Sequence, residues 1–309
     1  MNLSLFDLHC DTVCRMYERG EGFEENNLAV SLNRASVFQK YVQVMALFTS
    51  SRLSDSEGWL RSRELLSVLH GDSTTQSGKA RLCTTPSLEY TTADLLLSIE
   101  DARILENNID RVDILYHDGI RILTPLWRGE TCIGGSHDTN VGLTPFGKAA
   151  LKHAVKLGML LDISHASNTS AEEIFDICAA NDAPVIASHS NAFEICPVSR
   201  NLTREQTETI LRSNGIIGIN LCRPFLALDE KNADLDAVLR HIEYFCSIGA
   251  QNALCLGCDM DGAPLPVELC DISRLPALAE HLQKHNYPDE LIHAIFFENA
   301  YRFSVRYLH

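Results

Sequence analysis

The chain has 309 residues, of which 45% are hydrophobic and 22% are charged. This apolar fraction supports a large folded core and excludes the disordered and fibrous classes of protein. Acidic side chains number 41 against 26 basic ones, which gives a formal net charge of -15 at pH 7. Because lysine and arginine form no cluster, this charge excludes nucleic acid and anionic membranes as expected partners.

The 11 cysteines and the N-terminal segment bear on the cellular compartment. Several cysteines lie in apolar stretches, where cysteine behaves as a small hydrophobic residue. The first residues, MNLSLFDLHCDTV, lack the basic region, apolar core and cleavage site of a signal peptide. No apolar run approaches the roughly 18 residues that span a bilayer. We therefore expect a cytoplasmic protein with mostly free thiols.

Short apolar runs alternate along the chain with helical patterns, and these runs predict eight strands. The helical patterns include residues 56–71, 144–158, 170–182, 203–215 and 233–249. Eight strands alternating with helices predict an α/β protein with a (β/α)8 TIM barrel, and an open doubly wound sheet is the alternative. No linker divides residues 1–309, so we expect a single domain. The predicted strands are Leu3–Leu8, Val42–Phe48, Leu95–Ile99, Gly119–Leu123, Met159–Ile163, Pro184–Ala187, Ile216–Leu221 and Ala253–Leu256.

Residues able to bind a metal follow the ends of several predicted strands. His9 and Asp11 are two positions apart at the end of the first strand, so their side chains project to the same face of an extended chain. In a barrel, all of these strand ends lie on one rim, which is where barrel enzymes place their active sites. The other polar residues at strand ends are Glu100, His165, His189, Asp259 and Asp261.

Each of these residues, taken alone, also fits an ordinary structural role. A single histidine at a strand end is more often packed or surface-exposed than a metal ligand, Glu100 could cap the next helix, and Asp259 with Asp261 could brace a turn. Their convergence on one rim favours a metal site instead. Nitrogen and carboxylate ligands suit zinc, and a carboxylate that spans two ions would make the site binuclear. Metal-activated hydrolysis of an amide or ester is the expected chemistry.

Three other motifs predict no site. Cys255 and Cys258 form a lone CxxC pair without the second pair of a zinc module. Gly134 and Gly135 do not open a helix that could hold a phosphate, and no GxSxG motif of a serine hydrolase occurs.

Ordered motifs along nearly the whole chain resemble the membrane (renal) dipeptidase family, peptidase family M19 of the amidohydrolase superfamily. They are DLHCDT, SIED, GIRILTPL, GLTPFGKAALKHAVKLGMLLDISHAS, APVIASHSNAF, SRNL, GCDMDG and ENAYRFS. The resemblance implies an amidohydrolase-like barrel that binds two zinc ions and hydrolyses dipeptides. It also suggests a possible homodimer.

The resemblance also implies a role for each residue of the site. His9 and Asp11 would bind the first zinc ion, Glu100 would bridge both ions, and His165 and His189 would bind the second. Arg200 would hold the carboxylate of the substrate, because a guanidinium group can bind a carboxylate through two parallel hydrogen bonds. Asp259 would be the acid/base that takes a proton from a bridging hydroxide and delivers it to the leaving amine.

One position departs from the family pattern. Members of the family usually have a substrate-contacting histidine where this chain has Trp127, and tryptophan offers one N–H donor and no basic nitrogen. His137, in the glycine-rich loop 127–142, either folds back to replace that histidine or is an ordinary loop residue. Trp127 therefore leaves two alternatives open, a hydrolase of another small amide and a non-catalytic metal-binding relative.

Two further alternatives concern the metal. A mononuclear deaminase-type site would require His-x-His on the first strand, whereas the chain has His9 and Asp11. The same ligands would also accept manganese or iron, so other divalent metals are possible.

Overall fold

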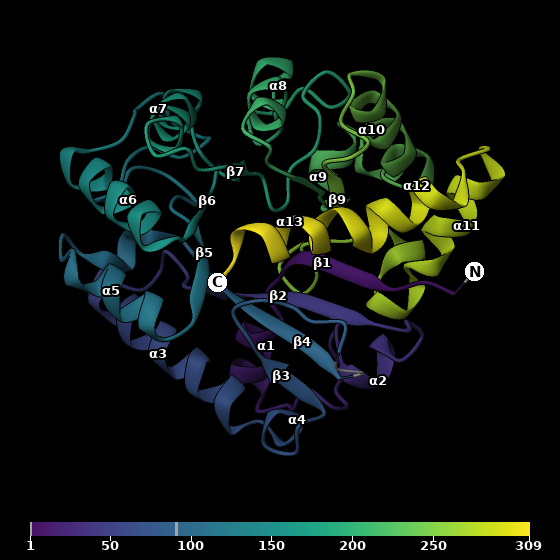
Figure 1. Cartoon of the computed structure of the whole chain (residues 1–309), viewed down its shortest axis with the longest axis horizontal. Coiled ribbons are helices and arrows are strands. Elements are labelled where there is room, and N and C mark those ends of the chain that lie inside the picture. The colour runs from purple at the N-terminus through teal and green to yellow at the C-terminus, as the bar shows by residue number, and fades with distance from the viewer. Residues whose placement is uncertain (1, 90–91) are drawn as a thin grey trace.

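The computed structural model describes residues 2–89 and 92–309, and its centre is a parallel barrel enclosed by helices (Figure 1). Hydrogen-bonded neighbours follow the order β7-β6-β5-β4-β2-β1-β9-β8. The barrel strands are β1 (Leu5–Cys10), β2 (Tyr41–Phe48), β4 (Ala93–Glu100), β5 (Ile120–Thr124), β6 (Leu160–Asp162), β7 (Val185–Ile186), β8 (Ile217–Ile219) and β9 (Leu254–Leu256).

A single parallel bridge between Ala187 and Ile217 joins β7 to β8 and closes the barrel. The Ala187 N–H donates to the Ile216 carbonyl at 3.0 Å, and the Gly218 N–H donates to the Ala187 carbonyl at 2.8 Å. The predicted (β/α)8 barrel is therefore confirmed, and each of the eight predicted strands overlaps a barrel strand. A further short strand, β3 (Ala80–Leu82), pairs with β4 and was not predicted, because three residues are too few to show an alternation of polarity.

Helices cover the outside of the barrel, and their ends carry the expected capping residues. Ser54 and Glu57 form a reciprocal capping box at the start of α3, and Gly158 ends α6 with a φ of 91°. The longer helices are α1 (Thr12–Arg19), α3 (Asp55–Gly71), α5 (Asp110–His117), α6 (Pro145–Leu157), α7 (Asn168–Ala179), α8 (Arg204–Arg212), α10 (Leu235–Ser247), α11 (Pro276–Lys284) and α13 (Asn299–Tyr307). The shorter ones are α2 (Leu32–Ala35), α4 (Ser73–Gln76), α9 (Arg223–Leu226), α12 (Asp289–His293), the 3-10 turns η1 (Ala102–Leu105), η2 (Glu230–Asn232), η3 (Val267–Leu269) and η4 (Ile272–Arg274), and the π-helical turn η5 (Ala294–Glu298).

Helix α13 lies across one end of the barrel (Figure 1). Phe297 and Phe303 belong to the same buried cluster as Phe6 and Val42, which lie on β1 and β2. The rings of Phe6 and Phe297 are 6.3 Å apart. Apolar side chains therefore fill the interior of the barrel at this end. The opposite rim, beyond the C-terminal ends of the strands, is the end where barrel enzymes place their active sites.

All eleven cysteines are free, as the sequence predicts. No helix in residues 2–89 or 92–309 is long and apolar enough to cross a membrane.

His241 on α10 ties the end of α9 to the segment that follows β7. Its Nδ1 accepts the N–H of Ala192 at 3.1 Å, and its Nε2 donates to the carbonyl of Leu226 at 3.1 Å. This pairing requires the neutral ring, and burial lowers the pKa of His241 to about 4. The folded state therefore binds this proton more weakly than the unfolded chain does.

We predict that protonation of His241 contributes to acid destabilisation. The stabilising effect of the neutral ring is complete above the ordinary histidine pKa of 6.5 and is lost as the pH falls from there toward 4. Between about pH 7.5 and about pH 5, the wild type should lose about 2 kcal/mol more free energy of unfolding than His241→Gln, which has no titrating ring. Denaturant titrations of both proteins at the two pH values measure this difference. Equal losses of unfolding free energy in the two proteins would contradict a contribution of His241 to acid destabilisation.

Candidate functional site

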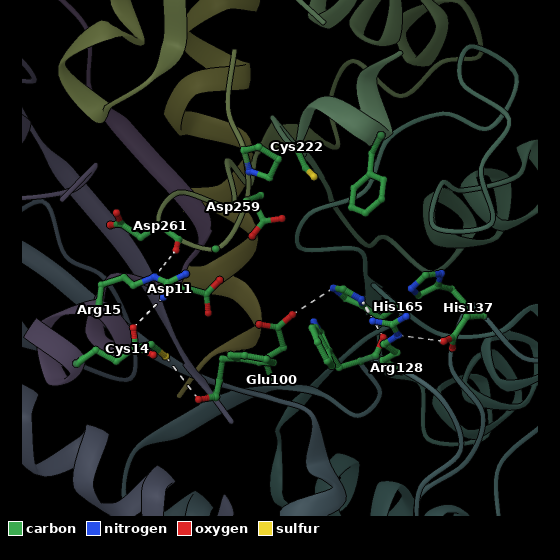
Figure 2. A pocket seen from close by; sticks show the side chains of 18 residues that line it. Asp11, Cys14, Arg15, Glu100, Arg128, His137, His165, Cys222, Asp259 and Asp261 are labelled. Carbon is green, nitrogen blue, oxygen red and sulfur yellow. Dashed lines mark hydrogen bonds and ion pairs between the residues drawn. The ribbon is translucent and has the colours of Figure 1, made fainter. Parts of the chain in front are cut away.

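Five strands bring the predicted site residues together at the C-terminal rim. His9 lies near the end of β1, and Asp11 directly follows this strand. Glu100 is the last residue of β4. Figure 2 shows Glu100 between Asp11 and Asp259 on one side and His165 and His137 on the other. The remaining residues follow their strands closely: His165 comes after β6, His189 after β7 and Asp259 after β9.

Glu100 is the centre of this arrangement. Its Oε2 lies 3.4 Å from Nε2 of His9, while its Oε1 lies 3.1 Å from Nε2 of His165 and 3.7 Å from Nε2 of His189. The two oxygens of one buried carboxylate therefore face different histidines. This is the arrangement of a carboxylate between two neighbouring cation positions.

The tautomer of His189 is determined by a buried hydrogen-bond chain. The Ser188 hydroxyl donates to Oδ2 of Asp162, which also accepts the Thr124 hydroxyl at 2.6 Å. Because the single hydroxyl proton of Ser188 is used there, Nδ1 of His189 donates to Ser188 Oγ at 2.6 Å. The Nε2 lone pair of His189 then points toward Glu100, and metal-binding histidines are oriented in this way.

His165 is oriented by the backbone instead. Its Nδ1 lies 3.2 Å from the carbonyl oxygen of Trp127, which can only accept, so Nδ1 carries the proton. Burial lowers the pKa of His165 and of His189 well below the ordinary value, with nearby positive charges adding to the effect, so both rings are neutral. Their Nε2 atoms lie 3.0 Å apart with no proton between them. Two lone pairs and a carboxylate at such distances fit a cation placed among them.

His9 and two carboxylates form the other half of the site. Nε2 of His9 lies 3.6 Å from Oδ2 of Asp11 and 3.9 Å from Oδ1 of Asp259. Among the described residues, Nε2 of His9 and Oδ1 of Asp11 are buried without a hydrogen-bond partner. Burial disfavours the charged form of His9, but the charges of Glu100 and Asp11 raise its pKa well above the ordinary value. A positive charge is therefore stabilised here, which also fits a metal ion.

The buried carboxylates of Glu100 and Asp259 also lack enough positive charge nearby to compensate their own charge. The pKa of Glu100 is raised to about 7 and that of Asp259 to about 6, chiefly by burial and also by the charge of Asp11, while the charge of His9 opposes the shift. Divalent ions bound by these groups would displace protons from them.

Asp259 is held by one oxygen and leaves the other free. Its Oδ2 accepts the side-chain N–H of Asn220 at 3.1 Å, and the Asp259 backbone N–H donates to the carbonyl of His9 at 3.1 Å. Its φ of 60° lies in the left-handed region, which a non-glycine residue adopts only when its surroundings hold it there. Asp261 accepts the Thr12 hydroxyl at 2.6 Å and the Ala29 N–H at 2.8 Å, which agrees with a role in supporting the turn.

A cavity of about 380 Å³ opens beside these residues. This volume is within the usual range for small-molecule sites. Its wall contains Trp127 and His137 together with acidic and basic side chains from both halves of the rim. The other lining residues are Asp11, Cys14, Arg15, Glu18, Phe48, Glu100, Arg128, Asp138, His165, Cys222, Phe225, Asp259, Asp261, Gly262, Ala263 and Pro264.

Trp127 and His137 lie on the cavity wall next to His165. The Trp127 ring packs on Phe48 with centroids 4.9 Å apart. The His137 ring lies 5.7 Å from that of His165, and its Nδ1 is 3.2 Å from the Ser199 hydroxyl. Burial, together with the charge of Arg200, lowers the pKa of His137 to about 4. The glycine-rich loop therefore does fold back and places a neutral histidine over the site.

Arg200 is placed differently from the other expected substrate-binding residues. It is buried and, of the described residues, is not one that lines the cavity. Its Nη1 donates to the Ser190 hydroxyl at 2.7 Å and its Nη2 to the carbonyl of His189 at 2.9 Å. Its Nε has no hydrogen-bond partner among the described residues. Arg200 therefore supports the strand end that carries His189 and adds a positive charge behind the wall.

Three positioning residues were not selected from the sequence. They are Asp162, Ser188 and Asn220, and each follows or ends a barrel strand. Asp162 and Ser188 were visible as polar residues at strand ends, but their contact with each other depends on the pairing of β6 with β7. Asn220 is the next-to-last residue of the predicted apolar strand Ile216–Leu221, and a polar residue at that point was the available signal.

Comparison with known proteins agrees with this geometry. The profile of the membrane dipeptidase family, peptidase family M19, matches residues 1–305. The chain belongs to this family. It is a metal-dependent hydrolase of the dipeptidase type, and the residues around Glu100 form a site that suits the metal cofactor of the family.

Individual relatives agree with the family assignment. An uncharacterized protein in the pqqA 5' region of Klebsiella pneumoniae is 31% identical over 242 residues, which cover 73% of this chain and 88% of that protein. The structure of dipeptidase AC, a metallopeptidase of family M19, superposes with a TM-score of 0.91 at 24% identity and covers 100% of this chain and 99% of that one. A Rhodobacter sphaeroides metallopeptidase bound to a phosphinate mimic of L-Ala-D-Ala has a TM-score of 0.90 at 23% identity, with 99% and 100% coverage. At these identities the two structures establish the shared barrel fold.

In this member of the family, we predict that Gly262→Ala weakens metal binding. An added Cβ would lie 2.0 Å from Oδ2 of Asp11 and 2.7 Å from Oδ1 of Asp259, so at least one carboxylate must move. Metal affinity should fall by roughly tenfold or more. Gly71→Ala, where nothing lies within 4 Å of the added atom, is the matched control and should keep its metal. Metal retained per chain after dialysis against a chelator measures both variants, and unchanged retention in Gly262→Ala would contradict the prediction.

Proposed function

We propose that this protein hydrolyses dipeptides with two zinc ions in the cavity at the barrel rim. The observation that supports this proposal best is the position of Glu100, whose two oxygens face separate histidines, Oε2 facing His9 and Oε1 facing His165. His9 and Asp11 would hold one ion, His165 and His189 would hold the other, and Glu100 would bridge the two. Histidine and carboxylate ligands suit zinc, although manganese or iron would also be accepted.

Bound divalent ions supply Lewis acidity, which activates a water molecule at neutral pH and polarises the scissile carbonyl. The protein itself orients the ligands for this purpose. Asp162 and Ser188 hold His189, and the Trp127 carbonyl holds His165, so that both Nε2 lone pairs face Glu100. Loss of these supporting contacts would weaken metal binding without removing any ligand.

Asp259 would be the acid/base. Because Asn220 occupies its Oδ2, its Oδ1 is the oxygen available to accept a proton from the attacking water and to return it to the leaving amine. Asn220 also donates to the carbonyl of His189 at 3.2 Å, so it links the acid/base to the strand end of a metal ligand.

The cavity would hold the substrate beside these groups. Arg200 would attract the C-terminal carboxylate through its buried charge, and His137, which lines the cavity, would donate a hydrogen bond to the carbonyl region. Trp127 and Phe48 would form an apolar wall against the substrate side chain. The Rhodobacter sphaeroides protein binds a mimic of L-Ala-D-Ala, which makes dipeptides with a C-terminal D-residue the first substrates to test.

A second candidate is hydrolysis of another small amide. Trp127, at the position where the family usually has a histidine, favours it, since an aromatic wall would select a different side chain or acyl group. The amide-cleaving machinery is the same in both cases. A substrate panel therefore separates them.

We predict that Asp259→Asn abolishes hydrolysis while sparing the metal. The amide cannot accept the proton of the attacking water, so kcat should fall by roughly 1,000-fold or more on every cleaved dipeptide. Zinc per chain, measured by elemental analysis, should remain near two. Asp138→Asn, which changes a carboxylate at the cavity wall that pairs with Arg128, is the control and should keep most of its activity. Full activity in Asp259→Asn would contradict the mechanism, and wild-type turnover of simple amides but of no dipeptide would favour the second candidate.

We predict that His137→Ala lowers kcat by roughly 100-fold, because the site loses a donor to the developing oxyanion. KM should change less, and the metal content should stay constant because His137 is not a proposed ligand. Ser199→Ala removes the partner of the His137 ring without removing the ring, and we expect it to cause a smaller loss. An unchanged kcat in His137→Ala would show that its place over the site has no catalytic consequence.

A further inference from the structure

Two outer helices carry a group of histidine and aspartate side chains that is separate from the barrel site and of a kind able to bind a metal. His281 and His285 lie four positions apart on the last turn and at the C-terminal cap of α11, and Asp236 lies in the first turn of α10. Figure 1 shows both helices outside the barrel. One ligand atom from each residue lies within 4.8 Å of the other two.

The tautomer of His285 is determined by the backbone. Its Nδ1 lies 2.9 Å from the carbonyl oxygen of His281, which can only accept, so Nδ1 carries the proton and Nε2 keeps its lone pair. A histidine that donates one ring N–H to a backbone carbonyl and presents the other nitrogen is oriented as a metal ligand. The His281 and His285 rings lie beside each other with centroids 4.5 Å apart.

His281 and Asp236 are close without being hydrogen-bonded. Nε2 of His281 lies 2.8 Å from Oδ1 of Asp236, yet this nitrogen is buried and has no hydrogen-bond partner within the described chain. The carboxylate therefore lies off the line of the ring nitrogen, at ion-pair distance but without a hydrogen bond. A cation along that line would be contacted by both groups.

The C-terminal end of α11 favours a cation at this position. The C-terminal end of α11 carries partial negative charge from its free carbonyl groups, and His285 is at that end. Two imidazoles and one carboxylate with open positions for water suit divalent zinc or nickel better than calcium or magnesium, which prefer oxygen ligands.

We propose that Asp236, His281 and His285 form a second, peripheral zinc site that ties α10 to α11. Asp236 and His285 are exposed, so small rotations of their side chains bring the three ligand atoms to coordination distance. The ion would stabilise the start of α10, the helix whose His241 holds the loop segment at Ala192 beside the barrel rim. The proposal is independent of the function proposed for the barrel site.

Zinc uptake by the zinc-loaded protein tests this site. After equilibrium dialysis against increasing concentrations of zinc, the wild type should bind one ion per chain more than His285→Ala, and Asp236→Asn should bind this ion at least roughly tenfold more weakly. His70→Ala, which removes another exposed helical histidine, is the matched control and should bind as the wild type does. The barrel ions are common to all four proteins, so the differences report only the peripheral site.

The melting temperature gives a second measurement. Added zinc should raise it in the wild type and in His70→Ala, because a ligand that binds the folded state stabilises that state, and should raise it less in His285→Ala. Equal zinc uptake by the wild type and His285→Ala at every concentration would overturn the proposal. So would a wild type that binds no zinc beyond the ions of the barrel site.

Discussion

The accumulation of hydrogen-bond acceptors around Glu100 is the constraint on which the rest of the rim depends. Nε2 of His165 and of His189 carry lone pairs at 3.0 Å from each other, and a carboxylate oxygen lies 3.1 Å from the first of them. Such groups repel each other unless positive charge lies between them, and burial increases the effect because water cannot screen it. The fold must therefore hold the acceptors in place until a cation compensates them.

Two kinds of support hold them. Hydrogen bonds from behind orient the rings, through Ser188 for His189 and through the backbone carbonyl of Trp127 for His165. The barrel supplies the rest, because it holds His165, Asp259 and Asp261 at φ values between 60° and 70°. Residues of this kind are stable in the left-handed region only where their surroundings hold them, and here the barrel strands on either side do so.

The sequence predicted the barrel because its strands are buried on both faces and therefore appear as continuous apolar runs separated by helical patterns. It predicted the rim residues because each follows such a run directly. It did not predict β3, whose three residues are too few to show a pattern. Nor did it predict that Asp162, Ser188 and Asn220 position the site, since their contacts depend on which strands are neighbours and on rotamers, neither of which has a signature along the chain.

The contacts of Arg200 also have no signature along the chain. A motif aligns the residue with a substrate-binding arginine, yet its terminal nitrogens are engaged by Ser190 and by the backbone of His189. Sequence places a residue near a site, but only packing determines whether the side chain reaches the cavity or stabilises the wall behind it.

The hydrogen bond from His165 to Trp127 has a consequence for how the protein can diverge. Since the bond uses the backbone carbonyl, any amino acid at position 127 can orient His165 equally well. The side chain at the same position lies on the cavity wall, where it meets whatever enters. In the function proposed above, metal binding and substrate choice would thus be separable at this residue, and an exchange of its side chain would change the substrate while leaving the reaction chemistry unchanged.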